Sequence, residues 1–216
     1  MDMASLAVVT LVLGPVQTNA FLVADPVGRV AAVIDPAWDG AEIVRQADLR
    51  GWRITDVWLT HAHFDHFGGA AEVCDRVQPP PRVALHPLDQ PLWRVNGGAA
   101  WFGMQDFDPG PEPTIDLAAG MMLNLGSFRF EVRHAPGHTP GHVVFYCAEA
   151  SQLFCGDVIF DGGVGRTDLP GGDWDELLAS IQAQVLSLPD DVALQPGHGP
   201  STTVGIQRRT NPFLVG

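Results

Sequence analysis

Residues 60–69 read THAHFDHFGG, and this stretch decides which kind of fold the chain adopts. Four metal-ligating side chains stand within six positions of one another there: His61, His63, Asp65 and His66. In an extended chain alternate side chains share a face, so His61 and His63 can bind one ion together. The chain must then turn into a helix, which points Asp65 and His66 elsewhere. Because four ligands from so short a stretch cannot easily surround one tetrahedral ion, we expect two neighbouring ions.

Two ions need further ligands from distant segments, and three candidates stand at the ends of expected strands. His138 lies in HAPGHTPGH, Asp157 in LFCGD and His198 in LQPGHG. The glycines and prolines beside them favour tight turns that hold a side chain at a sheet edge. A carboxylate can bind two cations at once, so Asp157 is expected to bridge them. The two expected sites are His61 with His63 and His138, and Asp65 with His66 and His198.

Short apolar strands and helices surround these motifs. Periodicity and turn residues predict ten strands, at 6–13, 20–25, 29–35, 54–60, 82–86, 121–125, 128–134, 142–147, 153–157 and 192–195. Helices are expected from Asp39 to Gly51, over 69–77 and from Asp173 to Leu188. Asp173 and Glu176 match a capping box. No linker or repeat interrupts the pattern, so we expect one domain over residues 1–216.

Residues 87–118 differ from the rest of the chain because they combine five prolines with several aromatic side chains. We expect an irregular segment there that forms a wall of a substrate pocket, a dimer contact or simple core packing. The sequence leaves open whether the chain forms a homo-oligomer.

The charge balance limits the partners of this protein. The chain carries 25 acidic and 12 basic residues, a net charge of −13 that repels phosphate backbones. Nucleic acid and an anionic membrane surface are therefore not expected as partners, and no apolar run is long enough to span a bilayer. The apolar N-terminal stretch lacks a basic region and an A-x-A cleavage site, so we expect a cytoplasmic protein. The three cysteines have no CxxC spacing and are predicted to be reduced, buried and inert.

The ligand pattern resembles the metallo-β-lactamase superfamily, and the resemblance runs from the Asp35 turn to the terminal RRTNPF. It implies an α+β fold, a four-layer αββα sandwich with the metals at one edge between two sheets. It also implies the full ligand set given by His61, His63, Asp65, His66, His138, Asp157 and His198. We expect two divalent ions, zinc first, although these ligands also suit iron or manganese. Asp65 and Asp157 are expected to act in catalysis as well.

Two adjacent divalent ions suit the hydrolysis of an activated acyl group. They lower the pKa of a shared water to about 7 and can polarise a carbonyl. A thioester is an apt substrate because a thiolate leaves readily, free thiols having a pKa of about 8.5. The expected activity is therefore a binuclear, metal-dependent thioesterase that uses a metal-bridging hydroxide.

A closer resemblance points to the same chemistry. The stretches LGPVQTNAFLV, GRTDLPGGD and RRTNPFL resemble short glyoxalase-II-like members of the superfamily. Those members resemble hydroxyacylglutathione hydrolases, which cleave S-lactoylglutathione to lactate and glutathione. Long members continue into a helical domain that binds glutathione, whereas this sequence ends 18 residues after His198. The resemblance therefore carries the acyl-thioester chemistry but not the identity of the thiol.

The same motifs leave other activities open. They also resemble persulfide dioxygenases, which hold one iron with two histidines and an aspartate, here His61, His138 and Asp157. The PGG after GRTDL favours the hydrolases over these enzymes. A lactone, another ester or a β-lactam could be opened by the same hydroxide. A non-catalytic metal-binding protein would lack ligands, yet all seven positions are filled.

Several further residues invite a functional interpretation beside a structural one. Arg166 and Asp168 stand either at the pocket mouth or in a turn that leads to the Asp173 helix cap, and we favour the turn. Arg208 and Arg209 are expected on a solvated helix or in a subunit contact rather than at a substrate carboxylate.

Three histidines lie outside the expected ligand set. His134 is expected to orient the loop that carries His138 by a hydrogen bond rather than to bind metal. His86 and His142 are expected to pack as ordinary structural residues.

Overall fold

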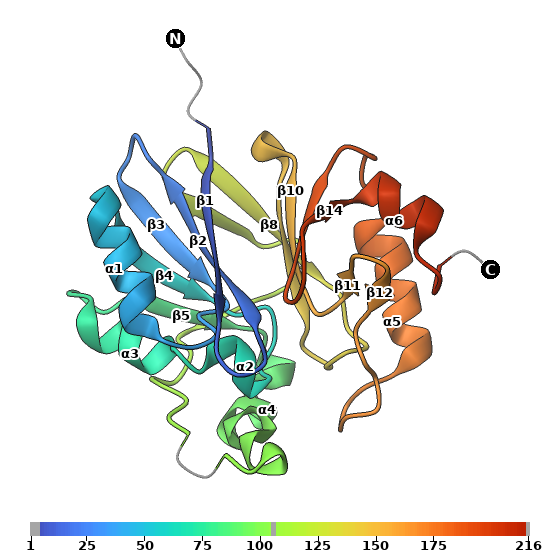
Figure 1. Cartoon of the computed structure of the whole chain (residues 1–216), viewed down its shortest axis with the longest axis horizontal. Coiled ribbons are helices and arrows are strands. Elements are labelled where there is room, and N and C mark those ends of the chain that lie inside the picture. The colour runs from blue at the N-terminus through green and yellow to red at the C-terminus, as the bar shows by residue number, and fades with distance from the viewer. Residues whose placement is uncertain (1–4, 105–106, 215–216) are drawn as a thin grey trace.

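The computed structural model describes residues 5–104 and 107–214. Two six-stranded sheets face each other, and helices cover the outer face of each (Figure 1). The predicted four-layer αββα sandwich is confirmed. The first four residues of the N-terminal stretch, residues 105–106 of the aromatic segment and the last two residues lie outside the described part of the chain.

The first sheet comes from the N-terminal half of the chain and has the strand order β1-β2-β3-β4-β5-β6. Its strands are β1 (Ala7–Leu13), β2 (Thr18–Asp25), β3 (Val30–Ile34), β4 (Arg53–Trp58), β5 (Arg82–Leu85) and β6 (Ile115–Asp116). The pairs from β1 to β3 are antiparallel, and those from β3 to β6 are parallel. Because β3, β4 and β5 run parallel, the loops that follow them leave the sheet at one edge.

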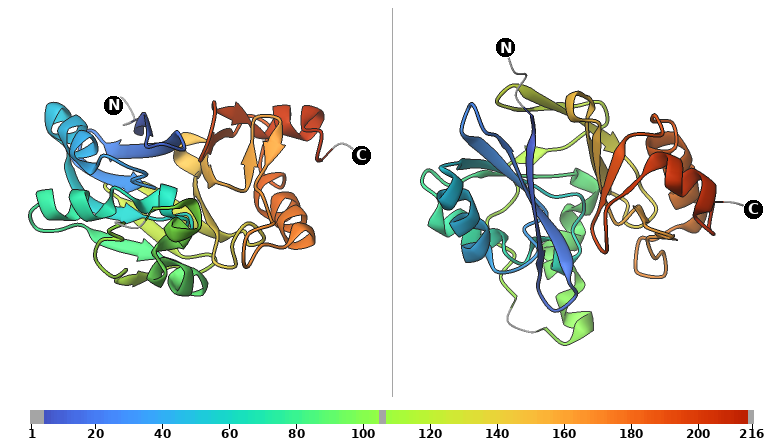
Figure 2. Two further views of the ribbon diagram at one scale, coloured as in Figure 1. Left: turned by 60° about the horizontal axis from the view of Figure 1, so that its bottom comes forward. Right: turned by 45° about the horizontal axis from the view of Figure 1, so that its top comes forward.

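The second sheet comes from the C-terminal half and has the order β14-β13-β10-β9-β8-β7. Its strands are β7 (Met122–Leu125), β8 (Phe128–His134), β9 (Val143–Cys147), β10 (Gln152–Gly156), β13 (Ala193–Pro196) and β14 (Thr202–Thr203). A small hairpin of β11 (Ile159–Phe160) and β12 (Gly163–Val164) follows β10. The two halves of the chain lie side by side in every view (Figures 1 and 2).

Strand β2 shows how the alternation of side chains builds the layers, because it is buried along its whole length. Ala20, Leu22 and Ala24 pack into the core beneath the helices of the first half. Phe21 and Val23 point the other way, into the core between the sheets. A period of two with apolar residues on both faces is typical of a strand covered on both sides.

Helices complete the two outer layers. The first sheet is covered by α1 (Gly40–Arg50) and α3 (Ala70–Arg76), the second by α5 (Trp174–Ser180), its π-helical continuation η4 (Ile181–Val185) and α6 (Val204–Thr210). The remaining helices are short: α2 (Phe64–Phe67), η1 (Pro87–Asp89), α4 (Gln90–Arg94), η2 (Asn96–Phe102) and η3 (Ala148–Ala150). Across residues 5–104 and 107–214, no helix combines the length and the apolar character that a membrane crossing requires.

Three predicted helix ends are confirmed in detail. Asp39 caps α1 by accepting from Glu42 N at 3.4 Å, and Gly51 ends the helix with a φ of 67°. Asp173 accepts from Glu176 N at 2.9 Å. The reciprocal half of the capping box is replaced, because Asp173 N donates to the carbonyl oxygen of Gly137 at 2.8 Å instead. That bond ties the start of α5 to the loop that carries His138.

The aromatic segment is more ordered than its composition predicts. It contains η1, α4, η2 and β6, and Trp93 and Phe107 pack against the core of the first half. The three cysteines are free and buried, as predicted. Burial raises the pKa of Cys74 and of Cys147 to about 11.

Candidate metal centre

The predicted ligands meet at the edge where the loops after β4 and β10 leave their sheets. β4 ends at Trp58, a bend follows at Thr60, and the backbone is extended at His63 before α2 begins at Phe64. His61 and His63 therefore precede the helix, whereas Asp65 and His66 lie on its first turn. The predicted turn into a helix after the second histidine is confirmed.

The three histidines predicted for the first site come together. Potential ligand atoms of His61, His63 and His138 all lie within 4.8 Å of one another, and all three residues are buried. His63 Nδ1 lies 2.9 Å from His138 Nε2. His138 reaches the cluster from the loop between β8 and β9, in the second sheet.

The second predicted group also comes together. Potential ligand atoms of Asp65, His66 and His198 lie within 4.8 Å of one another. Asp65 Oδ2 is 3.5 Å from His66 Nε2 and 3.3 Å from His198 Nε2. His198 is the most open member of this group, with its side chain 26% exposed.

Asp157 lies between the two groups. Its Oδ2 is 3.6 Å from His138 Nε2 in the first group and 3.6 Å from His198 Nε2 in the second. Its Oδ1 is 3.4 Å from His66 Nε2. Two ligands of one tetrahedral ion with bonds of 2.0–2.2 Å lie roughly 3.3–3.6 Å apart. The position of Asp157 therefore suits a carboxylate shared by two ions.

A second observation also indicates that these residues fit divalent metal ions: several of their polar atoms are buried without a hydrogen-bond partner. In the described part of the chain, these atoms include His61 Nε2, His66 Nε2 and Asp157 Oδ1. Such atoms are rare inside folded proteins because an unsatisfied polar group is costly to bury. Gly197 keeps the space between them open, since a Cβ there would lie 2.3 Å from Asp157 Oδ1 and 2.7 Å from His66 Cε1.

Hydrogen bonds on the far ring nitrogens turn the imidazoles toward the cluster. His138 Nδ1 lies 2.7 Å from the carbonyl oxygen of Arg166, which can only accept, so Nδ1 carries the proton and Nε2 carries the lone pair. His66 Nδ1 donates in the same way to Asp35 Oδ2 at 2.9 Å. A hydrogen bond on the second nitrogen is the usual support of a metal-bound histidine.

Asp35 supports both groups and was not singled out by the sequence beyond its place in the IDP turn. It is buried, and besides His66 it accepts from Thr60 N at 2.8 Å and from Thr60 Oγ1 at 2.6 Å. The Thr60 hydroxyl, having donated to Asp35, can accept from His61 Nδ1 at 3.0 Å. One carboxylate therefore orients a histidine of each group.

Burial and neighbouring charges lower the pKa of some histidines in the cluster and raise that of others. Burial, together with His66 and His142, lowers the pKa of His61 well below its usual value, and burial and His138 lower the pKa of His63 to about 3. Burial also acts against a proton on His66, but the Asp157 and Asp65 carboxylates outweigh it and raise that pKa. Burial lowers the pKa of His138 as well. Neutral imidazole is the form that binds metal, and the lowered pKa values of the first group favour that form.

The carboxylates are held in the ionised form. Burial acts to raise the pKa of Asp65, yet His66 and a hydrogen bond from His198 lower it to about 2. The same opposition, with His66 foremost among the lowering groups, depresses the pKa of Asp157. Both side chains are therefore anionic at neutral pH and suited to bind cations.

The histidines outside the ligand set have distinct partners. His134 Nε2 lies 2.9 Å from the carbonyl oxygen of Pro140, which confirms that it braces the His138 loop. His86 stacks on His134 with ring centroids 4.4 Å apart. His142 does more than pack, because Asp157 N donates to its Nε2 at 3.0 Å. The interpretation of His142 as an ordinary core residue missed this support of Asp157.

A pocket of about 250 Å³ opens over the cluster. Apolar walls dominate it, and the residues that line it are Val16, His63, Phe64, Asp65, Phe102, His138, Asp157, Arg166, Leu169 and His198. The Phe64 and Phe102 rings lie 5.2 Å apart, so the aromatic segment does contribute a wall through η2.

The arginines named from the sequence have different places. Arg166 lines the pocket, and its guanidinium makes two 2.7 Å hydrogen bonds to Asp168, so the pair lies at the pocket mouth. The predicted turn is present as well, because Gly172 N donates to Leu169 O at 2.9 Å just before the Asp173 cap. Arg208 donates to the carbonyl oxygens of Leu186 and Leu188, which fastens α6 to the end of η4.

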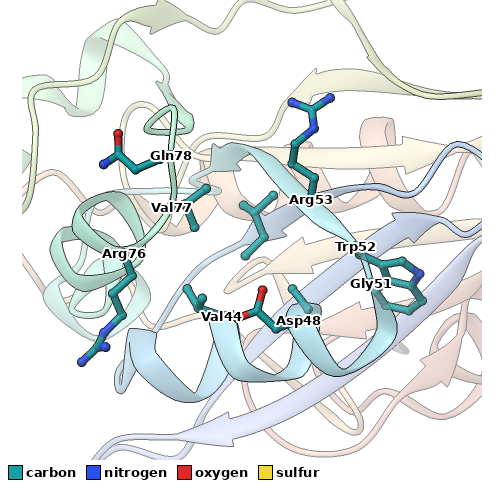
Figure 3. Close-up of a pocket in the computed structure, with 10 residues that line it drawn as sticks. Val44, Asp48, Gly51, Trp52, Arg53, Arg76, Val77 and Gln78 are labelled. Atoms are coloured by element: carbon teal, nitrogen blue, oxygen red, sulfur yellow. The ribbon is translucent and has the colours of Figure 1, made fainter.

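A second cavity of about 310 Å³ lies at the other end of β4, between the ends of α1 and α3 (Figure 3). Val44 and Val77 face its interior, whereas the side chains of Arg53 and Arg76 point away from each other. Its lining has no histidine or cysteine. It therefore offers none of the chemistry gathered at the first pocket.

Comparisons with known proteins agree with this geometry. Residues 13–198 match the family model of the metallo-beta-lactamase superfamily. The chain belongs to this superfamily. Together with the clustered histidines and aspartates, membership indicates a metal-dependent hydrolase that uses divalent metals.

Two relatives align with almost the whole of this chain. The probable metallo-hydrolase YqgX of Bacillus subtilis (strain 168) is 38% identical over 207 residues, which are 94% of this chain and 95% of the relative. The hydroxyacylglutathione hydrolase GloC of Haemophilus influenzae is 36% identical over 202 residues, 92% of this chain and 93% of the relative.

Two solved structures are similarly related. The BLEG-1 B3 metallo-beta-lactamase superposes with a TM-score of 0.90 at 36% identity, over 97% of this chain and all of the other. TTHA1623, in a di-iron-bound form, gives 0.86 at 42% identity, over 95% of this chain and all of the other. The names of GloC and BLEG-1 state different activities.

Proposed function

We propose that this protein is a binuclear metallohydrolase that cleaves acyl thioesters, in the manner of a glyoxalase II. The observation that carries the proposal is the position of Asp157, 3.6 Å from a histidine of each group. In this proposal His61, His63 and His138 hold one ion, Asp65, His66 and His198 hold the other, and Asp157 bridges them. We expect zinc, and the di-iron form of TTHA1623 makes iron the first alternative.

When bound, such ions would supply a water of lowered pKa and an electrophile for the carbonyl oxygen. The protein's own residues do the rest. Asp65 stays anionic because His66 and His198 depress its pKa, and its Oδ2 accepts from Thr18 Oγ1 at 2.9 Å. It is thus fixed in orientation, as a carboxylate that both binds and directs a nucleophile must be.

The pocket suits a thioester for two reasons. Its apolar walls, including Val16, Phe102 and Leu169, can exclude water from an acyl group and a sulfur atom. Within the pocket lining, His138 and His198 reach toward Asp157 and leave no separate acid for the leaving group. A thiolate needs little acid assistance because its conjugate thiol has a pKa near 8.5. The name of GloC supports the same substrate class.

The test is a substrate panel on protein of measured metal content. S-lactoylglutathione, an uncharged acyl thioester, a lactone and a β-lactam are compared by kcat/KM, and metal per chain is counted by mass spectrometry. We expect two ions per chain and a thioester preference of at least about tenfold. A preference for the β-lactam would instead assign the activity named for BLEG-1.

Oxygen uptake with glutathione persulfide tests the alternative in which one iron is held by His61, His138 and Asp157. One ion per chain together with persulfide-dependent oxygen uptake would contradict the hydrolase proposal. Two ions per chain, no oxygen uptake and thioester turnover would support it.

A further inference from the structure

Asp89 is a fully buried carboxylate that takes no part in the proposed ligand set. It ends η1, at the start of the aromatic segment, and its residue exposure is 0%. Its Oδ2 accepts from Ala62 N at 3.0 Å and from Thr139 Oγ1 at 2.7 Å, and its Oδ1 accepts from Gly141 N at 2.6 Å. A buried carboxylate is tolerated only with partners of this kind.

The partners of Asp89 belong to two separate loops, and both loops serve the first metal group. Ala62 stands between His61 and His63, whereas Thr139 and Gly141 follow His138. Asp89 therefore joins the only two segments that carry the three histidines of that group.

The second metal group has supports of its own. Thr18 bonds to Asp65, and Asp35 bonds to His66. Neither bond involves Asp89, so loss of Asp89 should affect the two groups unequally.

The contact between Asp89 and the second loop is too close to adjust by small movements. A Cβ on Gly141 would lie 2.6 Å from Asp89 N and 2.7 Å from Asp89 Oδ1. The backbone at Gly141 thus packs directly against the Asp89 carboxylate, with no side chain between them. The position of the carboxylate therefore sets the distance between the two segments.

We propose that Asp89 is a positioning residue that fixes the distance between the His61–His63 loop and the His138 loop and so preorganises the first metal site. The inference rests on the proposed two-metal site, but not on the thioester substrate. It also gives a role to the start of residues 87–118, namely to carry a carboxylate into the space between two ligand loops.

The decisive variant is Asp89→Asn, which keeps the shape of the side chain. Whichever way the amide turns, its NH₂ group faces a backbone N–H of Ala62 or of Gly141, so one loop loses its acceptor. We expect one of two binding steps to weaken by about tenfold or more while the other stays unchanged, as for other outer partners of metal ligands. Titration of the metal-free protein with cobalt(II), followed by its visible absorption, resolves the two steps without any assay of activity.

The matched control is Asp25→Asn. Asp25 is also a carboxylate of low exposure between two loops, since it accepts from Val27 N, Gly28 N, Ser127 N and Ser127 Oγ. It stands at the opposite end of β2 from Thr18, roughly 23 Å away at 3.3 Å per residue. This variant should lose thermal stability but bind both cobalt ions with unchanged affinity.

A milder variant keeps the test open if Asp89→Asn does not fold. Thr139→Val removes one hydrogen bond of the three and should weaken the same binding step by a smaller factor.

Each outcome decides between the alternatives. Wild-type affinity at both sites in the folded Asp89→Asn protein would overturn the positioning role, as would an equal loss of affinity in Asp25→Asn. A wild-type protein that binds only one cobalt ion would contradict the proposed binuclear function itself, and so the two failures are distinguishable.

Discussion

Asp157 touches both metal groups, and a single substitution at this position should therefore disable both. In Asp157→Ala the Oδ2 atom that lies 3.6 Å from His138 and from His198 is gone. We expect metal per chain to fall from two ions to one or none, and thioester hydrolysis to fall to the background rate. Metal analysis after gel filtration, paired with the thioester assay, measures both. Activity that survives in metal-stripped Asp157→Ala protein would show the mechanism to be wrong, and the exposed Asp175→Ala serves as control.

Substitution of Asp168 should change the affinity for a negatively charged substrate. Its carboxylate neutralises Arg166 at the pocket mouth, although both side chains are more than half exposed and their pairing contributes little to stability. Asp168→Asn frees the guanidinium for a substrate carboxylate. We expect KM for S-lactoylglutathione to fall severalfold, with kcat unchanged and no effect on an uncharged thioester. Equal changes in KM for both substrates would show that Arg166 only shapes the loop.

Residue chemistry explains which parts of the site the sequence could predict. The seven ligand candidates are histidines and aspartates beside glycine and proline turns, a combination with few structural uses. Asp35, beside Pro36, and His142, after Gly141, share that setting, and Asp89 lies two residues after Pro87. What the sequence does not show is their partners, which are a histidine or a backbone amide far along the chain. Only the fold brings those partners together, so an isolated aspartate or histidine in the sequence could not be told from a turn residue.

At the scale of elements, α5 shows how a helix cap can serve a distant loop. Asp173 caps the helix, and its own N–H donates to Gly137, the residue before His138. Asp173→Ala should lower the free energy of unfolding by about 1 kcal/mol, since the cap is lost while the backbone bond can remain. Urea denaturation measures the change, with Asp175→Ala, at the second position of the helix, as control. Equal stability of the Asp173→Ala and wild-type proteins would show that the Gly137 contact alone fixes the start of α5.

The elements missed by the sequence are those too short to show a period. β6, β11, β12 and β14 have two residues each, and a two-residue strand displays no alternation. Within residues 87–118, η2 contains Gly97 and Gly98 at positive φ, which breaks any helical pattern. The ten longer strands and the helices α1, α3 and α5 were predicted because apolar periodicity and the residues that begin and end an element agree along them.

At the scale of the whole molecule, the candidate metal centre lies between two sheets that come from different halves of the chain. The first half supplies His61, His63, Asp65 and His66, and the second half supplies the other three candidates. Backbone hydrogen bonds also join the two sheets at this edge. Asn19 N donates to Gly197 O at 2.7 Å, and Val143 N donates to Thr60 O at 2.8 Å. Ions held there would act as a further link between the sheets, present only in the folded state.

Removal of the metal should therefore loosen this edge and lower the melting temperature. A ligand at about 1,000 times its Kd stabilises the folded state by about 4 kcal/mol, which for a chain of this size corresponds to roughly 10 °C. We expect chelation to lower Tm by about that amount and added zinc to restore it. Hydrogen exchange should rise around Asn19 and Thr60 but not around Asp25, at the far end of β2. An unchanged Tm, or exchange that rises evenly along β2, would contradict a metal link between the sheets.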